Sequence, residues 1–104
     1  MDIEFVCGDT WEFDVVLKNE DGSDFTLGEN DKVWFNVKRR WTDTECAISV
    51  VQSETHFKIP PEQTNLFAGK YYGDIGIIFS SGDVYTVIPE INVIVRNKVQ
   101  PYGS

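Results

Sequence analysis

Apolar and polar residues alternate along much of this chain, and no other feature limits its fold as strongly. In residues 11–17 the apolar side chains fall on every second position, with Val16 as the exception. The same spacing returns in residues 33–37, where Trp34 adds an aromatic ring to the otherwise polar face. A period of two is typical of a β-strand covered on one face, whereas an amphipathic helix repeats about every 3.6 residues. Because no long helical period occurs, we predict an all-β protein.

Turn-forming residues divide the chain into short segments. The Asp-Gly pair in "NEDGSD" (19–24) suits a hairpin or a bulged loop, and "GEND" (28–31) and "SSGD" (80–83) are further turns. The prolines of "PPEQTNL" (60–66) cannot donate to a ladder, so we expect one helical turn there. Pro89 interrupts the last apolar segment and predicts an edge position or a bulge.

These breaks leave a series of short strands. Besides the two alternating segments, we expect strands at residues 46–51, 56–59, 70–79 and 83–95. About seven or eight strands with turns roughly every 8–12 residues are typical of a sandwich or a small barrel. Since 104 residues suffice for one ordinary domain, we predict a single antiparallel, immunoglobulin-like β-sandwich over residues 1–97 and a loose tail at 98–104.

The charge of the chain narrows the class of partner. The net charge is −8, which argues against nucleic acid as a partner, because phosphate binding needs a basic face. The one basic cluster, Lys38–Arg40, is interpreted as the charged end of a strand. No apolar run is long enough for a bilayer, and "MDIEFVCG" lacks the pattern of a signal peptide. We therefore expect no membrane partner, synthesis in the cytoplasm and reduced thiols at Cys7 and Cys46.

Few residues are suited to catalysis or metal binding. His56 is the only histidine, and it alternates with Phe57, which places it on the outer face of a strand rather than beside a nucleophile such as Cys7. The acidic residues of 19–24 do not follow the ligand spacing of an EF-hand, so a solvated turn explains them, with weak calcium binding as the alternative. We predict no catalytic residue, no metal site and no cofactor.

Aromatic residues leave two interpretations open. Trp34 and Trp41, with Tyr71 and Tyr72, could line a face that stacks on sugar rings. A thin sandwich also needs large side chains to fill its core, and this second interpretation is favoured for a chain of this size.

Three blocks of the sequence carry a recognisable pattern: "GDTWEFDVVLKNEDGSDF", "DKVWFNVKRR" and "TNLFAGKYYGDIGIIFSSGDVYTVIPEINVIV". Together they resemble a small β-sandwich module of structural proteins in tailed phages and prophages. This module occurs at the N-terminus of baseplate and receptor-binding components in phages of Gram-positive bacteria. The chain departs from the module at Pro89 and Glu90, where a glycine is usual, and residues 41–57 do not align.

The resemblance implies a structural role for the residues that match the module. This structural signature comprises Gly8, Asp9, Thr10, Asp21, Gly22, Gly69, Tyr71, Asp74 and Ile75. Within it, Asp74 is expected to accept hydrogen bonds from the backbone of a neighbouring loop or strand. Gly73 and Gly76 are expected to leave room for a close-packed aromatic ring, while Tyr71, Ile75 and Ile77 face the core.

The resemblance also implies a function. It indicates a non-enzymatic virion structural protein of the baseplate, the tail tip or the head surface, assembled in the host cytoplasm and then part of the virion. Its partners would be other virion proteins, with a homo-oligomer, a trimer or larger, as a further expectation. The alternative is a carbohydrate-binding module that adheres to host surface glycans through Trp34 and Trp41.

Overall fold

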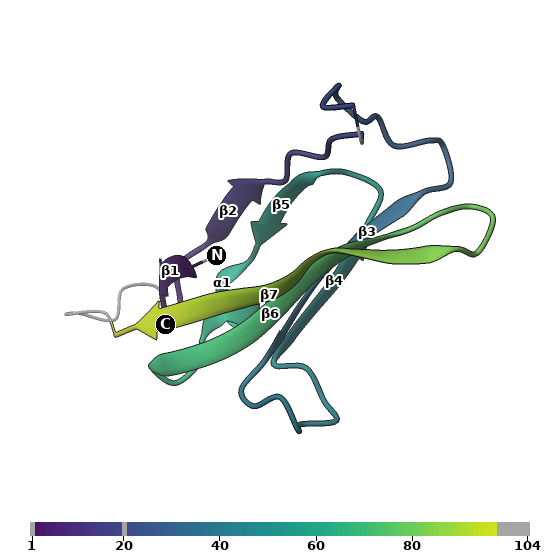
Figure 1. The fold of residues 1–104 in the computed structure, drawn as a ribbon. Coiled ribbons are helices and arrows are strands. Elements are labelled where there is room, and N and C mark those ends of the chain that lie inside the picture. Colours follow the sequence, from purple (N-terminus) through teal and green to yellow (C-terminus); the bar gives the residue numbers. More distant parts are fainter. Residues whose placement is uncertain (1, 20, 98–104) are drawn as a thin grey trace.

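The computed structural model describes residues 2–19 and 21–97, and the predicted tail at 98–104 lies outside them (Figure 1). Strands dominate the described residues, so the all-β prediction is confirmed. In chain order the elements are β1 (Asp2–Val6), β2 (Trp11–Asp14), β3 (Lys32–Lys38), β4 (Ile48–Gln52), β5 (His56–Ile59), α1 (Pro61–Thr64), β6 (Gly69–Ile78) and β7 (Val84–Arg96). The single helical turn, α1, lies within the predicted segment 60–66 and has a proline in its first turn.

Five strands form the larger sheet, in the order β1-β7-β6-β3-β4. All its neighbours are antiparallel except β1, which pairs with β7 in parallel from Asp2↔Asn92 to Val6↔Arg96. The prediction of a purely antiparallel sandwich is therefore wrong at this edge. A parallel pair needs a long connection between its strands, and β1 and β7 are joined by almost the whole chain. The immunoglobulin-like arrangement is not confirmed.

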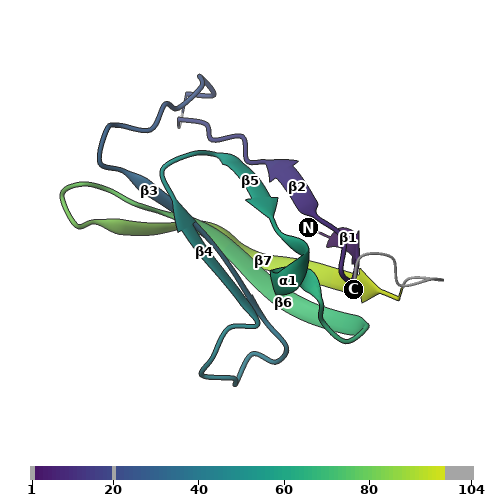
Figure 2. The ribbon, with the colours of Figure 1, turned by 180° about the vertical axis from the view of Figure 1, so that it is seen from behind.

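The smaller sheet consists of β2 and β5, paired antiparallel from Trp11↔Ile59 to Asp14↔His56. It lies over one face of the larger sheet (Figures 1 and 2). Aromatic rings meet between the two sheets. The ring centroid of Phe35 in β3 lies 5.1 Å from that of Phe13 and 6.0 Å from that of Phe57. The core between the sheets comprises Trp11, Val15, Leu17, Val33, Phe35, Val37, Ile48, Phe57, Ile59, Tyr71, Ile75, Ile77, Ile91, Val93 and Val95.

The alternation that begins at Trp11 extends further than the strand itself. Val15 and Leu17 are buried as the period predicts, but β2 ends at Asp14. Its partner β5 has only four residues, so the ladder stops where the partner stops. Beyond Asp14, the chain is held by individual backbone hydrogen bonds outside the ladder, such as the one from the Val15 amide to the Thr55 carbonyl (2.9 Å).

The hairpin of β6 and β7 is much longer than the small sheet that covers it, and its tip extends beyond that sheet (Figure 1). The register of the pair shifts twice, between Gly73 and Ile75 and again between Ile75 and Gly76. Pro89 and Glu90 together oppose Asp74, which confirms the bulge expected at Pro89. Bulges bend and twist a strand, so they mark where this projecting arm begins.

Candidate functional site

Asp74, the carboxylate inside strand β6, has a structural partner. It lies on the outer face of the larger sheet, where its Oδ1 accepts a hydrogen bond from the Trp34 indole Nε1 at 3.0 Å. The prediction of a backbone donor is therefore wrong. The donor is the side chain of Trp34, two residues from Asn36, which is the residue opposite Asp74 in the ladder. An amphipathic ring needs a polar partner for its N–H when it is buried, and Asp74 supplies it.

Gly76 completes this arrangement by leaving space for the same ring. It is opposite Trp34 in the β3–β6 ladder, and a Cβ at this position would overlap the indole carbons Cζ2 and Cη2. The expected room for an aromatic ring is thus confirmed at Gly76. Trp34 is only 9% exposed although it is on the outer face, so its proposed contact with glycans is wrong.

Other signature residues hold the ends of strands. Tyr71, Ile75 and Ile77 are buried in the core as predicted, and the Tyr71 hydroxyl donates to the Phe67 carbonyl at 2.8 Å. Gly69 has φ +145°, and a Cβ there would collide with the guanidinium of Arg39, which lies 4.7 Å from the Tyr71 ring centroid. These contacts close the end of the larger sheet.

The block Gly8–Thr10 anchors the short helix to the first strand. Gly8 has φ +75° and donates its amide to the Thr64 carbonyl at 3.1 Å. The fully buried Thr64 hydroxyl donates to the Asp9 carbonyl at 2.5 Å, while Thr10 is exposed. Thr64 was not among the predicted signature residues. Its position, three residues after Pro61 and two before Leu66 in the segment expected to form a helical turn, was the signal available.

In the loop at 19–24, the carboxylates of Asp21 and Asp24 already have partners. Asp21 Oδ1 accepts hydrogen bonds from the Ser23 amide (2.9 Å) and hydroxyl (2.6 Å), which lower the pKa of this carboxyl. Gly22 has φ +87°, as the turn requires, and Asp24 pairs with Lys18. In the part of the chain that the structure describes, no three His, Cys, Asp or Glu side chains are grouped for a metal.

His56 lies on the outer face of the small sheet, between two carboxylates. Its Nδ1 is 2.6 Å from Asp14 Oδ1 and its Nε2 is 2.8 Å from Glu12 Oε2. The hydrogen bond to Asp14, followed by the one to Glu12, raises the pKa of His56 above its ordinary value of 6.5. Both ring nitrogens of His56 are therefore hydrogen-bonded to carboxylates. This geometry is that of a charged surface cluster of three side chains rather than of a catalytic dyad with a thiol. Cys7 and Cys46 are both free thiols.

The pKa of His56 gives a direct prediction. We expect an NMR titration to show it raised, with D14N lowering it more than E12Q, because the bond to Asp14 is the larger cause. Because the folded-state pKa is raised, the contact of His56 with Asp14 and Glu12 stabilises the fold fully at pH values just below the pKa that His56 has in the unfolded chain, and this contribution is lost as pH rises through the folded-state value. The chain has one histidine, so the signals need no assignment. Equal titration curves for the wild type and D14N would contradict the geometry.

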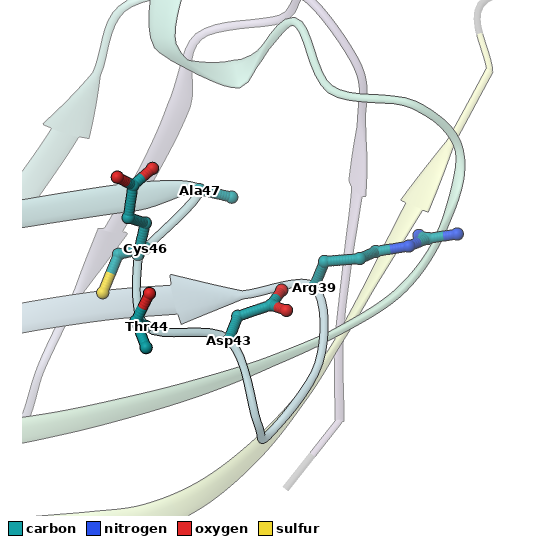
Figure 3. Close-up of a pocket in the computed structure, with 6 residues that line it drawn as sticks. Arg39, Asp43, Thr44, Cys46 and Ala47 are labelled. Atoms are coloured by element: carbon teal, nitrogen blue, oxygen red, sulfur yellow. The ribbon is translucent and has the colours of Figure 1, made fainter.

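Two hollows lie at the β3–β4 loop. The first, of about 400 Å³, is lined by Arg39, Asp43, Thr44, Glu45, Cys46 and Ala47. In Figure 3 the Arg39 side chain points away from Thr44 and Cys46, which fits its stacking on Tyr71 at the sheet end. The predicted basic cluster is thus a strand end: β3 stops at Lys38, and Arg39 and Arg40 follow in the exposed loop.

The second hollow, of about 250 Å³, is a groove on the outer face of the larger sheet. Its lining comprises Asn36, Lys38, Trp41, Thr44, Cys46, Tyr72, Gly73 and Asp74. Trp41 is 54% exposed, and its ring centroid lies 4.8 Å from that of Tyr72. The structure therefore separates the two tryptophans that the sequence grouped together: Trp41 borders an open groove, while Trp34 is covered.

The projecting arm carries the third and most apolar surface. Val84, Tyr85 and Val87 are exposed by 59%, 58% and 41%. A cleft of about 380 Å³ beside them is lined by Leu17, Lys18, Asn19, Phe25, Ile77, Phe79, Tyr85 and Val87. The rings of Phe25 and Phe79 meet edge to face at 5.9 Å, and those of Phe79 and Tyr85 at 5.7 Å. This arm surface was not predicted, because its residues follow the same pattern as buried strand positions.

Comparison with known proteins adds no family assignment. The chain matches no protein-family model, and no curated protein is significantly similar to it in sequence. Among the described residues, no helix has the length and apolar character needed to cross a membrane. The resemblance to the phage modules remains a prediction based on the three sequence blocks.

Proposed function

We propose that this chain is a non-enzymatic structural module of a tailed-phage or prophage particle and acts through protein–protein contacts. Its place would be the baseplate, the tail tip or the head surface. The observation that carries the proposal is the arm surface, where Tyr85 and Val87 of β7 are exposed and line an apolar cleft. Contiguous exposed apolar residues of this kind mark interaction sites on soluble proteins.

The anatomy of the arm fits a protein partner better than a small ligand. Aromatic rings line the cleft, and aromatic residues are enriched at the centres of protein interfaces. Among the described residues that line it, Lys18 alone is charged, and it is paired with Asp24. Assembly around a symmetry axis, as a trimer or a larger ring, is part of the same proposal.

The test follows the chain through a density gradient of particles released from the bacterium that encodes it. We expect an antibody to the chain to detect it in the particle band, at a fixed ratio to the major structural proteins. Light scattering of the purified chain over a concentration series then separates self-assembly from attachment to a different protein. Particles that band without the chain, while it stays with the free proteins, would refute the proposal.

A second candidate function is adhesion to host glycans through the groove at Trp41. The neighbouring rings of Trp41 and Tyr72, tilted by 32° to each other, line the groove together with polar groups of Asn36, Lys38 and Asp74. Sugars bind to such a combination because their apolar ring faces stack on aromatics while their hydroxyls form hydrogen bonds. A labelled chain applied to an array of bacterial surface glycans tests it, with W41A as the variant that should lose all binding.

A further inference from the structure

Strand β7 is paired on both sides over only part of its length. From Asn92 to Val95 it has β1 on one side and β6 on the other. From Val84 to Ile88 it pairs with β6 alone, and no other strand of the described residues pairs with it there. The outward-facing backbone groups of this segment are therefore open to pairing with another chain.

The side chains along this open edge are apolar on the side of the cleft. Tyr85 is opposite the core residue Ile77, so its ring continues the core face of the larger sheet past the end of the small one. It contacts Phe79, which in turn contacts Phe25. An extended segment laid against β7 would thus place every second side chain toward these rings.

The two ends of the open segment are acidic. Asp83 precedes Val84 and Glu90 follows Pro89, and both carboxylates are exposed. Pro89 has no backbone N–H, and the bulge around Val87 disturbs the ladder, so regular pairing is limited to about Val84–Thr86. Because the ladder is short, the apolar cleft must supply most of the buried area.

We propose that the partner is an extended segment of another protein, with alternating apolar residues and with Lys or Arg at both ends. It adds alongside Val84–Ile88, inserts its apolar side chains into the cleft of Phe25, Phe79 and Tyr85, and sets its basic ends against Asp83 and Glu90. Strand addition of this kind takes affinity from the main chain and specificity from alternate side chains. This inference rests on the proposed function only in requiring a protein partner.

A second copy of this chain is a poorer occupant. If two copies paired antiparallel about the open segment, Asp83 of one would lie beside Glu90 of the other. Like charges placed opposite each other destabilise a strand pair, and each copy already carries a net charge of −8. The acidic ends therefore favour a basic partner and oppose self-association at this edge.

The experiment uses a synthetic peptide, Lys-Val-Thr-Val-Thr-Val-Lys with blocked ends, titrated into the full isotope-labelled chain at low ionic strength. The matched peptide has glutamate in place of both lysines. We expect amide shifts at Val84–Ile88, Phe79 and Phe25, with the lysine peptide binding at least about tenfold more tightly than the glutamate peptide. Y85S should weaken binding by about tenfold or more, because the exposed ring is lost without disturbing the core.

A pair of charge variants separates the effect of the charge at Glu90 on peptide binding from the effect of the net charge of the chain. E90K should reduce the preference for the lysine peptide, whereas E45K, in the exposed β3–β4 loop, changes the net charge equally and should leave it intact. Absence of shifts in the arm, equal affinity for the two peptides, or equal effects of E90K and E45K would each overturn the inference. Association with particles is measured separately in the density gradient, so failure here is distinguishable from failure of the proposed function.

Discussion

Replacing Phe35 by alanine is expected to lower the free energy of unfolding by about 3–5 kcal/mol, the usual cost of deleting a buried aromatic ring. Phe35 has no exposed surface, and its ring packs against Phe13 and Phe57, two of the aromatic residues of the small sheet. The small sheet has only two short strands, so loss of the Phe35 ring would remove a large part of its packing against the larger sheet. Since a domain of this size is stable by roughly 5–15 kcal/mol, this loss is a large fraction of the total, and F35A becomes marginally stable if the wild type lies near the lower end of that range.

Urea denaturation followed by circular dichroism measures this loss, and the chain supplies a matched control. Phe67 is 88% exposed, so F67A removes the same side chain without opening a cavity. We expect F67A to lie within about 0.5 kcal/mol of the wild type. If F35A and F67A had similar effects, the two sheets would not share the core described above.

Replacing Gly76 by alanine is expected to cost about 3 kcal/mol, the upper range for forcing an extra methyl group into a packed site. The new Cβ would overlap the Trp34 ring and lie 2.6 Å from the Tyr85 carbonyl oxygen. The ring cannot move aside freely, because its N–H is bonded to Asp74 at 3.0 Å. The backbone oxygen on the other side is fixed by the β6–β7 ladder.

Two comparisons make this prediction specific to the clash. Gly82, in the turn of the same hairpin, has φ +95°, but a Cβ added there would meet nothing within 4 Å, so G82A should cost only about 1 kcal/mol through its backbone. In the double variant W34L/G76A the smaller side chain relieves part of the overlap. Its destabilisation should therefore be less than the sum of the two single effects, and strict additivity would contradict the contact.

The outer-face contact also bears on where function lies. Trp34, Asp74 and Gly76 form one interlocked set, and their spacing across two strands is a requirement of packing. A carboxylate and glycines inside a strand thus need no catalytic explanation. The open surfaces are the arm of β6 and β7 and the groove beside Trp41, whose lining includes Asp74.

Much of the local structure followed from the sequence alone. The period of two identified which side chains of β3 face the core, and the resemblance implied those of β6. The Asp-Gly and Ser-Ser-Gly-Asp turns were placed correctly. The helical turn and the bulge at Pro89 followed from the missing N–H of proline, which is a property of the residue itself. Features of this kind are determined by residues that are adjacent in the chain, so the sequence is sufficient to predict them.

The candidate site was less accessible, because exposure depends on what lies across the sheet. Trp34 and Trp41 look alike in the sequence, yet only the tertiary structure covers one with Gly76 and Asp74 and leaves the other open. The strand Asp2–Val6 was missed although Ile3 and Phe5 alternate with acidic residues, since its partner is at the other end of the chain. Alternation fixes the face on which a side chain lies, but the pairing of distant strands decides which faces and edges remain uncovered. The apolar arm is uncovered for that reason: β7 continues past both β1 and the small sheet, and no local pattern records where a partner strand ends.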